Sequence, residues 1–207
     1  DSTGSGGVIG EGDVQWMTAG AGIVHEEFHA ESFGKRGGEF EMAQLWVNLP
    51  AKDKKTPARY QHLAKDNITV VPLADDAGHA RIIAGRFGNT DGAAETFTEL
   101  NVWDIVLNGG ASADLDVPAG HNLMLVVLRG EVRINGGQSV QASQMATFER
   151  ESGSVKVEAV GGEAKILLLS GVPIDEPVVG YGPFVMNTEA EIAEVMNEFR
   201  SGKFGAV

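Results

Sequence analysis

Short apolar runs separated by glycine-rich turns dominate the chain from residue 68 onward. Turn sequences such as Asn108-Gly109-Gly110 and Asn135-Gly136-Gly137 separate runs that are rich in β-branched and other apolar residues. The pattern predicts strands over residues 68–71, 80–84, 96–107, 122–129, 131–134, 140–148, 155–159 and 164–169. Many short strands at close spacing are typical of an all-β sandwich or barrel. We therefore expect this part of the chain to form a β-barrel domain.

The first fifty residues carry strand patterns as well. They predict strands over residues 8–9, 12–17, 23–25 and 40–49. In the last of these, apolar and polar residues alternate loosely, which places Phe40, Met42 and Trp46 on one face. Pro50 lacks the N–H that a strand ladder needs, so the pattern ends there.

A charged, proline-bounded segment follows at residues 51–57. Its lysines Lys52, Lys54 and Lys55 could form an anion-binding patch, but such a run is more often a solvated linker, and we expect a linker here. We place a domain boundary near this segment. The predicted parts are a first β-domain over residues 1–55, a second over 56–180, and a C-terminal helix and tail over 181–207.

One helix is predicted near the C-terminus. Thr188 and Glu191 have the spacing of a capping box, in which each side chain satisfies a backbone N–H at the start of a helix. The apolar residues that follow have helical spacing and predict a face packed against the domain, and Gly202 is the expected end of the helix. These apolar residues are Ile192, Val195, Met196 and Phe199.

Composition excludes several classes of function. The chain of 207 residues is 43% apolar and 22% charged, as in ordinary soluble globular proteins, and its net charge of −13 would repel a phosphate backbone. Direct nucleic-acid binding is therefore not expected. The absence of cysteine excludes disulfides and cysteine nucleophiles and fits a reducing cytoplasm. No run reaches the roughly 18 to 20 apolar residues that span a bilayer, so no membrane association is expected.

His25 and Glu27 are the candidate metal ligands. Residues two apart on a β-strand point to the same face, so an imidazole and a carboxylate would converge there. One imidazole and one carboxylate suit divalent iron, manganese, nickel, copper or zinc, but useful sites have three or four protein ligands. Taken alone, the pair is more often an ordinary half-buried histidine and a solvated glutamate.

The residues around this pair carry a family resemblance. The segment from Gly12-Asp13 to His25 resembles the second conserved motif of cupins, with Thr18 where proline is usual. Further segments complete the pattern: residues 12–20, 22–25, 44–50, 60–61, 171–173, 176–177 and 182–188. On these segments the chain resembles the pirin family over almost its whole length.

The resemblance implies a fold and a metal centre. Pirins are similar to bicupins, so it implies an all-β protein of two cupin-type jelly-roll barrels with a short C-terminal helix. It implies iron, most simply Fe(II), held by three histidines and a glutamate, of which His25 and Glu27 would be the last two. The first two histidines come from a His-Pro-His-like segment that this sequence lacks, so we expect an incomplete first barrel, two further ligands from a missing N-terminal segment, and weak metal binding by this form. His121, in a turn without a second histidine, is not expected to be a ligand, and the second barrel is expected to hold no metal.

The resemblance also implies two classes of function. The first is a non-haem iron dioxygenase acting on flavonols such as quercetin, with Glu27 as ligand or general base. Trp16, Met17 and Phe28 are then candidate cavity walls, and structural core residues are the equally open alternative for each. The second is a non-enzymatic regulator whose metal state controls binding to a transcription factor or a metabolic enzyme. A metal-free, inert form is a third alternative. Relatives of this kind suggest a cytoplasmic monomer.

Overall fold

β-Strands account for most of the regular structure in a computed structural model of the chain, which describes residues 1–150 and 153–206. Residues 151, 152 and 207 lie outside this description; the last of them ends the expected C-terminal tail. The chain divides into two compact units: a first unit of Asp1–His62 with Ile174–Val207, and a second unit of Leu63–Pro173. The all-β class is confirmed. The domain boundaries expected from the sequence, at residues 55 and 180, remain predictions.

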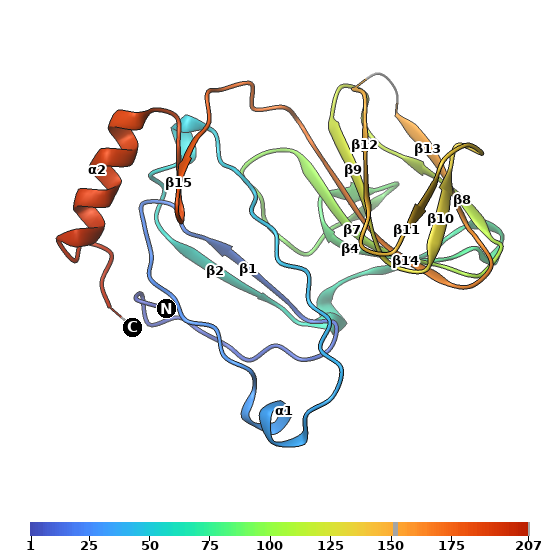
Figure 1. The fold of residues 1–207 in the computed structure, drawn as a ribbon, viewed down its shortest axis with the longest axis horizontal. Helices are drawn as coiled ribbons and strands as arrows, with labels where there is room; N and C mark the ends of the chain where they lie inside the picture. The colour runs from blue at the N-terminus through green and yellow to red at the C-terminus, as the bar shows by residue number, and fades with distance from the viewer. Residues whose placement is uncertain (151–152, 207) are drawn as a thin grey trace. The chain divides into compact units, whose positions relative to one another are not determined.

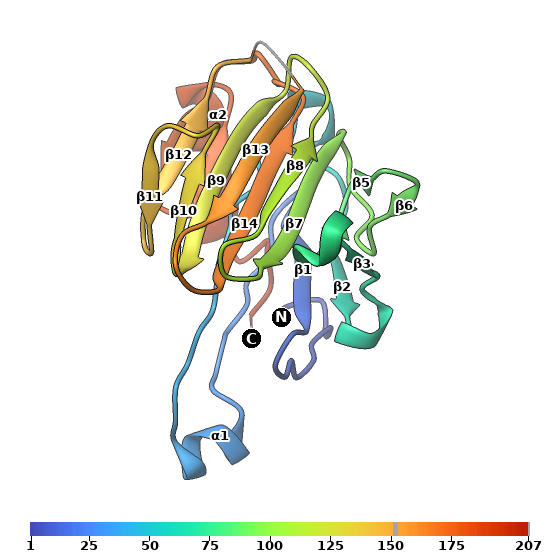
Figure 2. The same cartoon turned by 90° about the vertical axis from the view of Figure 1, so that its right-hand side faces the viewer.

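The second unit consists of two antiparallel sheets that face each other (Figure 2). Its strands are β3 (Val70–Pro72), β4 (Gly78–Ala84), β7 (Leu100–Leu107), β8 (Ser112–Asp116), β9 (Asn122–Arg129), β10 (Glu131–Ile134), β11 (Ser139–Gln141), β12 (Met145–Phe148), β13 (Ser154–Ala159) and β14 (Ala164–Gly171), with a small hairpin of β5 (Arg86–Phe87) and β6 (Thr90–Asp91). One sheet has the order β12-β9-β14-β7-β4-β3, and the other has the order β11-β10-β13-β8. The sheets enclose the core of this unit.

Alternation along the strands builds that core. On β7, β9 and β14 every second residue is buried between the sheets, and Trp103, Leu125 and Leu168 are fully buried. These three lie in register across the sheet, Leu168 opposite both Trp103 and Leu125. Each large apolar side chain buried in this way contributes about 1.5–3 kcal/mol. The hydrophobic pattern therefore determined which face of each strand points inward.

Most strands of the second unit overlap those predicted from the sequence. The predicted strand over residues 96–107 begins only at Leu100, and the short hairpin of β5 and β6 was not predicted. Two further differences have a physical reason. The predicted strand over residues 140–148 is two strands, β11 and β12, because Ser143 between them has a left-handed backbone (φ 67°) that breaks the ladder. β8 was not predicted, since only Leu115 among its five residues is fully buried and the others are small or acidic. Such a strand shows little of the apolar alternation on which the prediction rested.

The first unit contains short strands and two helices (Figure 1). They are β1 (Val14–Thr18) paired with β2 (Arg59–Leu63), β15 (Val179–Tyr181) paired with β16 (Phe184–Met186), α1 (Glu31–Arg36) and α2 (Glu189–Arg200). Single 3₁₀ turns lie at Ala51–Asp53, Lys65–Asn67 and Ala74–Asp76, the first of them in this unit. The described residues of the first unit do not close a barrel.

Three strands predicted in the first unit are wrong. Residues 8–9, 23–25 and 40–49 belong to no strand of the described structure. In the last segment Phe40 and Trp46 are 57% and 69% exposed. Alternation identifies residues that can form a strand, but a strand also needs a neighbouring strand to complete its ladder. No strand of the described structure forms such a ladder with these segments.

The C-terminal helix begins as predicted. The Thr188 hydroxyl accepts the Glu191 backbone N–H at 3.2 Å and donates to the Glu191 carboxylate at 2.9 Å. The helix ends at Arg200, and Gly202 follows with a left-handed backbone. The predicted packing face is partly buried: Ile192 is buried, and Val195 and Met196 are half-buried. Phe199 is 51% exposed, although its ring still packs against those of Phe184 and Phe204.

Lys54, expected in a solvated linker, is buried instead. Its ammonium donates to Asn48 Oδ1 at 2.7 Å and to the Val185 carbonyl at 3.2 Å. Burial lowers the pKa of Lys54, and the carboxylates of Glu176 and Glu191 oppose that shift. The linker prediction is wrong for this lysine because β16 brings a backbone acceptor to it, while the other two lysines of the run are exposed as expected.

Candidate functional site

The structure places His25 and Glu27 in an irregular segment of the first unit, and both side chains are exposed. The predicted strand that would have aligned them is absent from the described structure. Gly20 and Gly22 have positive φ angles of 54° and 124°, which interrupt an extended run. Val24 is bonded to Ser2 instead: Ser2 N donates to the Val24 carbonyl at 2.7 Å, and Val24 N donates to Ser2 Oγ at 3.1 Å.

Glu27 has one side-chain neighbour of functional interest. The Gln44 amide nitrogen lies 3.3 Å from Glu27 Oε2 and 3.4 Å from Oε1, so it donates to the carboxylate from the segment that follows α1. An amide in this position can orient a carboxylate that ligates a metal or accepts a proton.

The donor types of this pair fit a divalent transition metal, but the number of donors does not. Within residues 1–150 and 153–206 no group of three or more histidine, aspartate or glutamate side chains is placed to hold a metal ion. A useful site needs three or four such ligands. His25 and Glu27 therefore supply at most part of a metal centre.

The expected cavity walls differ in burial. Trp16 and Met17 on β1 are half-buried, whereas the Phe28 side chain is 83% exposed. The described residues therefore do not enclose Phe28, and it forms no cavity wall among them.

Comparison with known proteins decides the family. The family described as Pirin C-terminal cupin domain matches residues 102–205, and the family described as Pirin matches residues 1–47. A candidate quercetin 2,3-dioxygenase of Pseudomonas aeruginosa is 49% identical over 204 residues, which cover 99% of this chain and 71% of that protein. The chain belongs to the pirin family.

Other pirins support the same assignment. A pirin-like protein of Caulobacter vibrioides is 38% identical over 206 residues, covering 99% of this chain and 72% of that protein. The crystal structure of a quercetin 2,3-dioxygenase from Acinetobacter baumannii superposes with a TM-score of 0.96 at 48% identity, over all of this chain and 71% of that one. The family resemblance read from the sequence is confirmed.

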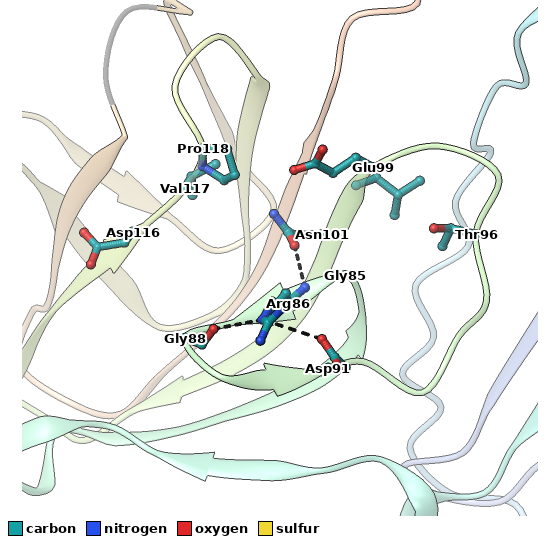
Figure 3. Close-up of a pocket in the computed structure, with 11 residues that line it drawn as sticks. Gly85, Arg86, Gly88, Asp91, Thr96, Glu99, Asn101, Asp116, Val117 and Pro118 are labelled. Atoms are coloured by element: carbon teal, nitrogen blue, oxygen red, sulfur yellow. Dashed lines mark hydrogen bonds and ion pairs between the residues drawn. The ribbon is translucent and has the colours of Figure 1, made fainter.

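The second unit of this pirin contains a pocket that sequence reasoning missed (Figure 3). Its volume is about 640 Å³, and it lies where the β5–β6 hairpin, the start of β7 and the turn after β8 meet. Its lining residues are Gly85, Arg86, Gly88, Asp91, Thr96, Glu99, Leu100, Asn101, Asp116, Val117 and Pro118.

One signal for this pocket was present in the sequence. Asn101 and Ser170 occupy inward-facing positions of strands whose other inward residues are apolar, and both are buried. A polar residue at a core position needs a partner, so such a break in the pattern marks a polar site. The pairing of β7 with β14 that brings the two together could not be read from the chain.

No helix in the described part of the chain is long and apolar enough to cross a membrane.

Proposed function

We propose that this pirin is a metal-dependent dioxygenase that cleaves flavonols such as quercetin with O₂. The observation that supports the proposal most is the likeness, along the whole chain, to a protein described as quercetin 2,3-dioxygenase, at a TM-score of 0.96 and 48% identity. The 49% identity to the candidate quercetin 2,3-dioxygenase of Pseudomonas aeruginosa supports it independently.

His25 and Glu27 are the residues we assign to this chemistry. An iron(II) ion, when bound, would supply oxygen activation, and these two side chains would provide two of its ligands. Glu27 is alternatively the base that takes a proton from the acidic hydroxyl of the flavonol, with the Gln44 amide holding its carboxylate. The described residues by themselves do not form a complete ligand set.

We also propose a cytoplasmic, monomeric protein. The absence of cysteine fits a reducing compartment. Size-exclusion chromatography with light scattering tests the oligomeric state, and fractionation of the native host tests the compartment.

The first prediction concerns the two assigned residues. Protein that also carries the two further expected histidine ligands is loaded anaerobically with Fe(II), its metal content is measured by elemental analysis, and quercetin and oxygen are then added. Protein that retains iron should consume quercetin and O₂ together. Glu27→Gln and His25→Gln should each lower iron retention and abolish this turnover, because removing one ligand weakens the chelate. The neighbouring, exposed Glu26 supplies the matched control, and Glu26→Gln should behave as wild type.

The outcomes separate this proposal from a regulatory role. Iron-loaded protein that leaves quercetin and O₂ untouched would contradict the dioxygenase and favour a metal-dependent regulator. Unchanged iron content and turnover in both His25→Gln and Glu27→Gln would instead contradict the ligand assignment.

A further inference from the structure

The tail that follows helix α2 carries one buried side chain. Among the described residues 201–206 only Phe204 is buried, at 8% exposed. Its ring centroid lies 6.2 Å from that of Phe199, near the end of α2. The tail returns to the first residues of the chain, which belong to the same unit (Figure 1). Phe204 is therefore the anchor of this tail.

Gly22 is the residue on which Phe204 packs. A Cβ added at Gly22 would lie 2.3 Å from Phe204 Cε1 and 2.4 Å from Phe204 Cδ1, so the ring occupies the space that a side chain would take. Gly22 also has a φ of 124°, which residues with a Cβ rarely adopt. Two independent constraints, the backbone conformation and the Phe204 ring, thus require glycine at this position.

The tail also contacts Ser2, which is bonded to Val24. A Cβ added at Gly205 would lie 3.0 Å from Ser2 Cβ, so the tail approaches Ser2 closely. Ser2 N donates to the Val24 carbonyl at 2.7 Å, and Val24 N donates to Ser2 Oγ at 3.1 Å. The tail therefore contacts the segment over residues 22–24 directly, through Phe204 on Gly22, and indirectly, through Ser2 on Val24.

His25 follows this segment immediately. The chain before the segment is held separately, because Ala21 N donates to the Thr56 carbonyl at 2.8 Å. After the segment, no backbone hydrogen bond of the described structure involves residues 25–29. Val24 is thus the last backbone anchor before His25, and the direction in which His25 leaves the segment depends on it.

We propose that Phe204 is a positioning residue for His25. Packed on Gly22, it holds residues 22–24 in place, and these residues fix the direction of the next one. The inference rests on the proposed function in one respect, which is that His25 serves as a ligand. A ligand that is held in advance loses less conformational freedom on binding, and the complex is tighter for that reason.

A general contribution to stability is the alternative explanation of this contact, because a buried phenylalanine side chain stabilises a folded unit wherever it lies. The two explanations differ in where the effect of removing the Phe204 ring appears. A positioning role predicts changes at Val24 and His25 that spare Ala21, which Thr56 holds. A general role predicts equal changes at all of these residues.

The test is ¹⁵N NMR of the whole, metal-free chain. Phe204→Ala should raise the amide exchange rate of Val24 at least about tenfold, because the segment opens locally. It should also lower the ¹⁵N heteronuclear NOE of the His25 amide, which reports fast backbone motion. Ala21 should keep its exchange rate within about twofold. Tyr181→Ala is the matched control, since it removes an aromatic ring of the same unit that is 61% exposed, and it should leave Val24 and His25 as in the wild type.

Two further variants test the contact between Phe204 and Gly22 itself. Gly22→Ala places a Cβ against the ring and must displace it, so it should raise the exchange rate of Val24 as well. When Gly22→Ala and Phe204→Ala are combined the ring is absent, and the increase should be smaller than the product of the two separate increases. Phe204→Leu keeps an apolar side chain and should raise the exchange rate of Val24 about 2- to 10-fold, which tests the proposal even if Phe204→Ala fails to fold.

Three results would overturn the proposal. The first is wild-type exchange at Val24 and a wild-type NOE at His25 in Phe204→Ala or, if that variant does not fold, in Phe204→Leu. The second is an equal rise in exchange at Ala21 and Val24, which would show general destabilisation. The third is a double variant whose increase equals the product of the single ones. All three are measured without metal, so they are distinct from a failure of the dioxygenase proposal, which iron retention and quercetin turnover decide.

Discussion

At the scale of single residues, Gly85 shows how closely the pocket end of the second unit is packed. Its backbone is left-handed (φ 79°), and an added Cβ would lie 2.1 Å from both the Leu100 carbonyl oxygen and Asn101 Oδ1. Gly110 has nearly the same backbone (φ 76°) but faces open space. Alanine substitutions at the two glycines therefore distinguish the energetic cost of backbone strain, present at both, from the cost of steric overlap, present only at Gly85.

Gly85→Ala and Gly110→Ala should have different costs. We expect Gly110→Ala to lower the free energy of unfolding by about 1 kcal/mol, the cost of a left-handed alanine. Gly85→Ala should lower the free energy of unfolding by at least about 3 kcal/mol, because the backbone of β7 must also move. Urea denaturation followed by circular dichroism measures both values, and equal losses would contradict the close approach at Gly85.

The sequence identified His25 and Glu27 as candidate metal ligands by residue type and spacing, but it did not predict their environment. The His-x-Glu spacing and the preceding Gly12-Asp13 identified the family correctly. Exposure of both side chains and the Gln44 contact to Glu27 depend on segments 17 residues apart in the sequence meeting in space. The residue spacing within one segment does not predict tertiary contacts of this kind.

At the scale of elements, the sequence prediction was correct for the start of helix α2 and wrong for the segment over residues 40–49, which forms no strand in the described structure. A helix satisfies its hydrogen bonds within itself, and its capping box is local, so Thr188 and Glu191 predicted the start of α2 correctly. A strand is completed by a neighbour that may lie anywhere in the chain. The alternation over residues 40–49 therefore predicted a strand that the described structure does not form.

The cap of α2 should depend on pH. The hydrogen bond from the Thr188 hydroxyl, followed by bonds from backbone N–H groups, lowers the pKa of Glu191 below its ordinary value of 4.5. The folded pKa is thus below the unfolded one, so the stabilisation is complete above pH 4.5 and is lost as the pH falls through the folded value.

Hydrogen exchange of the α2 amides measures this effect. Protection should fall on acidification in the wild type and be less dependent on pH in Glu191→Gln, whose side chain cannot titrate. Glu189→Gln, in the same helical turn, should keep the wild-type profile. An identical pH profile in Glu191→Gln and wild type would contradict the assignment.

At the scale of the whole molecule, the second unit holds a core formed by both of its sheets. Leu125 on β9 is fully buried in it, whereas Met145, on the neighbouring strand β12, is 56% exposed. Leu125→Ala should lower the free energy of unfolding by about 2–5 kcal/mol, because it leaves a cavity. Met145→Ala should cost less than about 1 kcal/mol.

Trp103 can report on this core alone. It is fully buried there, so urea unfolding followed by its fluorescence, with Trp16 and Trp46 replaced by phenylalanine, measures the stability of the second unit. Equal changes for Leu125→Ala and Met145→Ala would contradict the packing described.

The sequence by itself determined the all-β class, the pirin family, most strands of the second unit and the capped helix. Each of these depends on a pattern within one segment, such as alternation, a capping pair or a motif. Tertiary structure alone decided the exposure of His25 and Glu27, the burial of Lys54 and the pocket around Asn101. These features arise where strands and turns distant in the chain come together, as β7 and β14 do at Asn101 and Ser170. Pairing of that kind is set by the packing of the whole unit, which no single segment encodes.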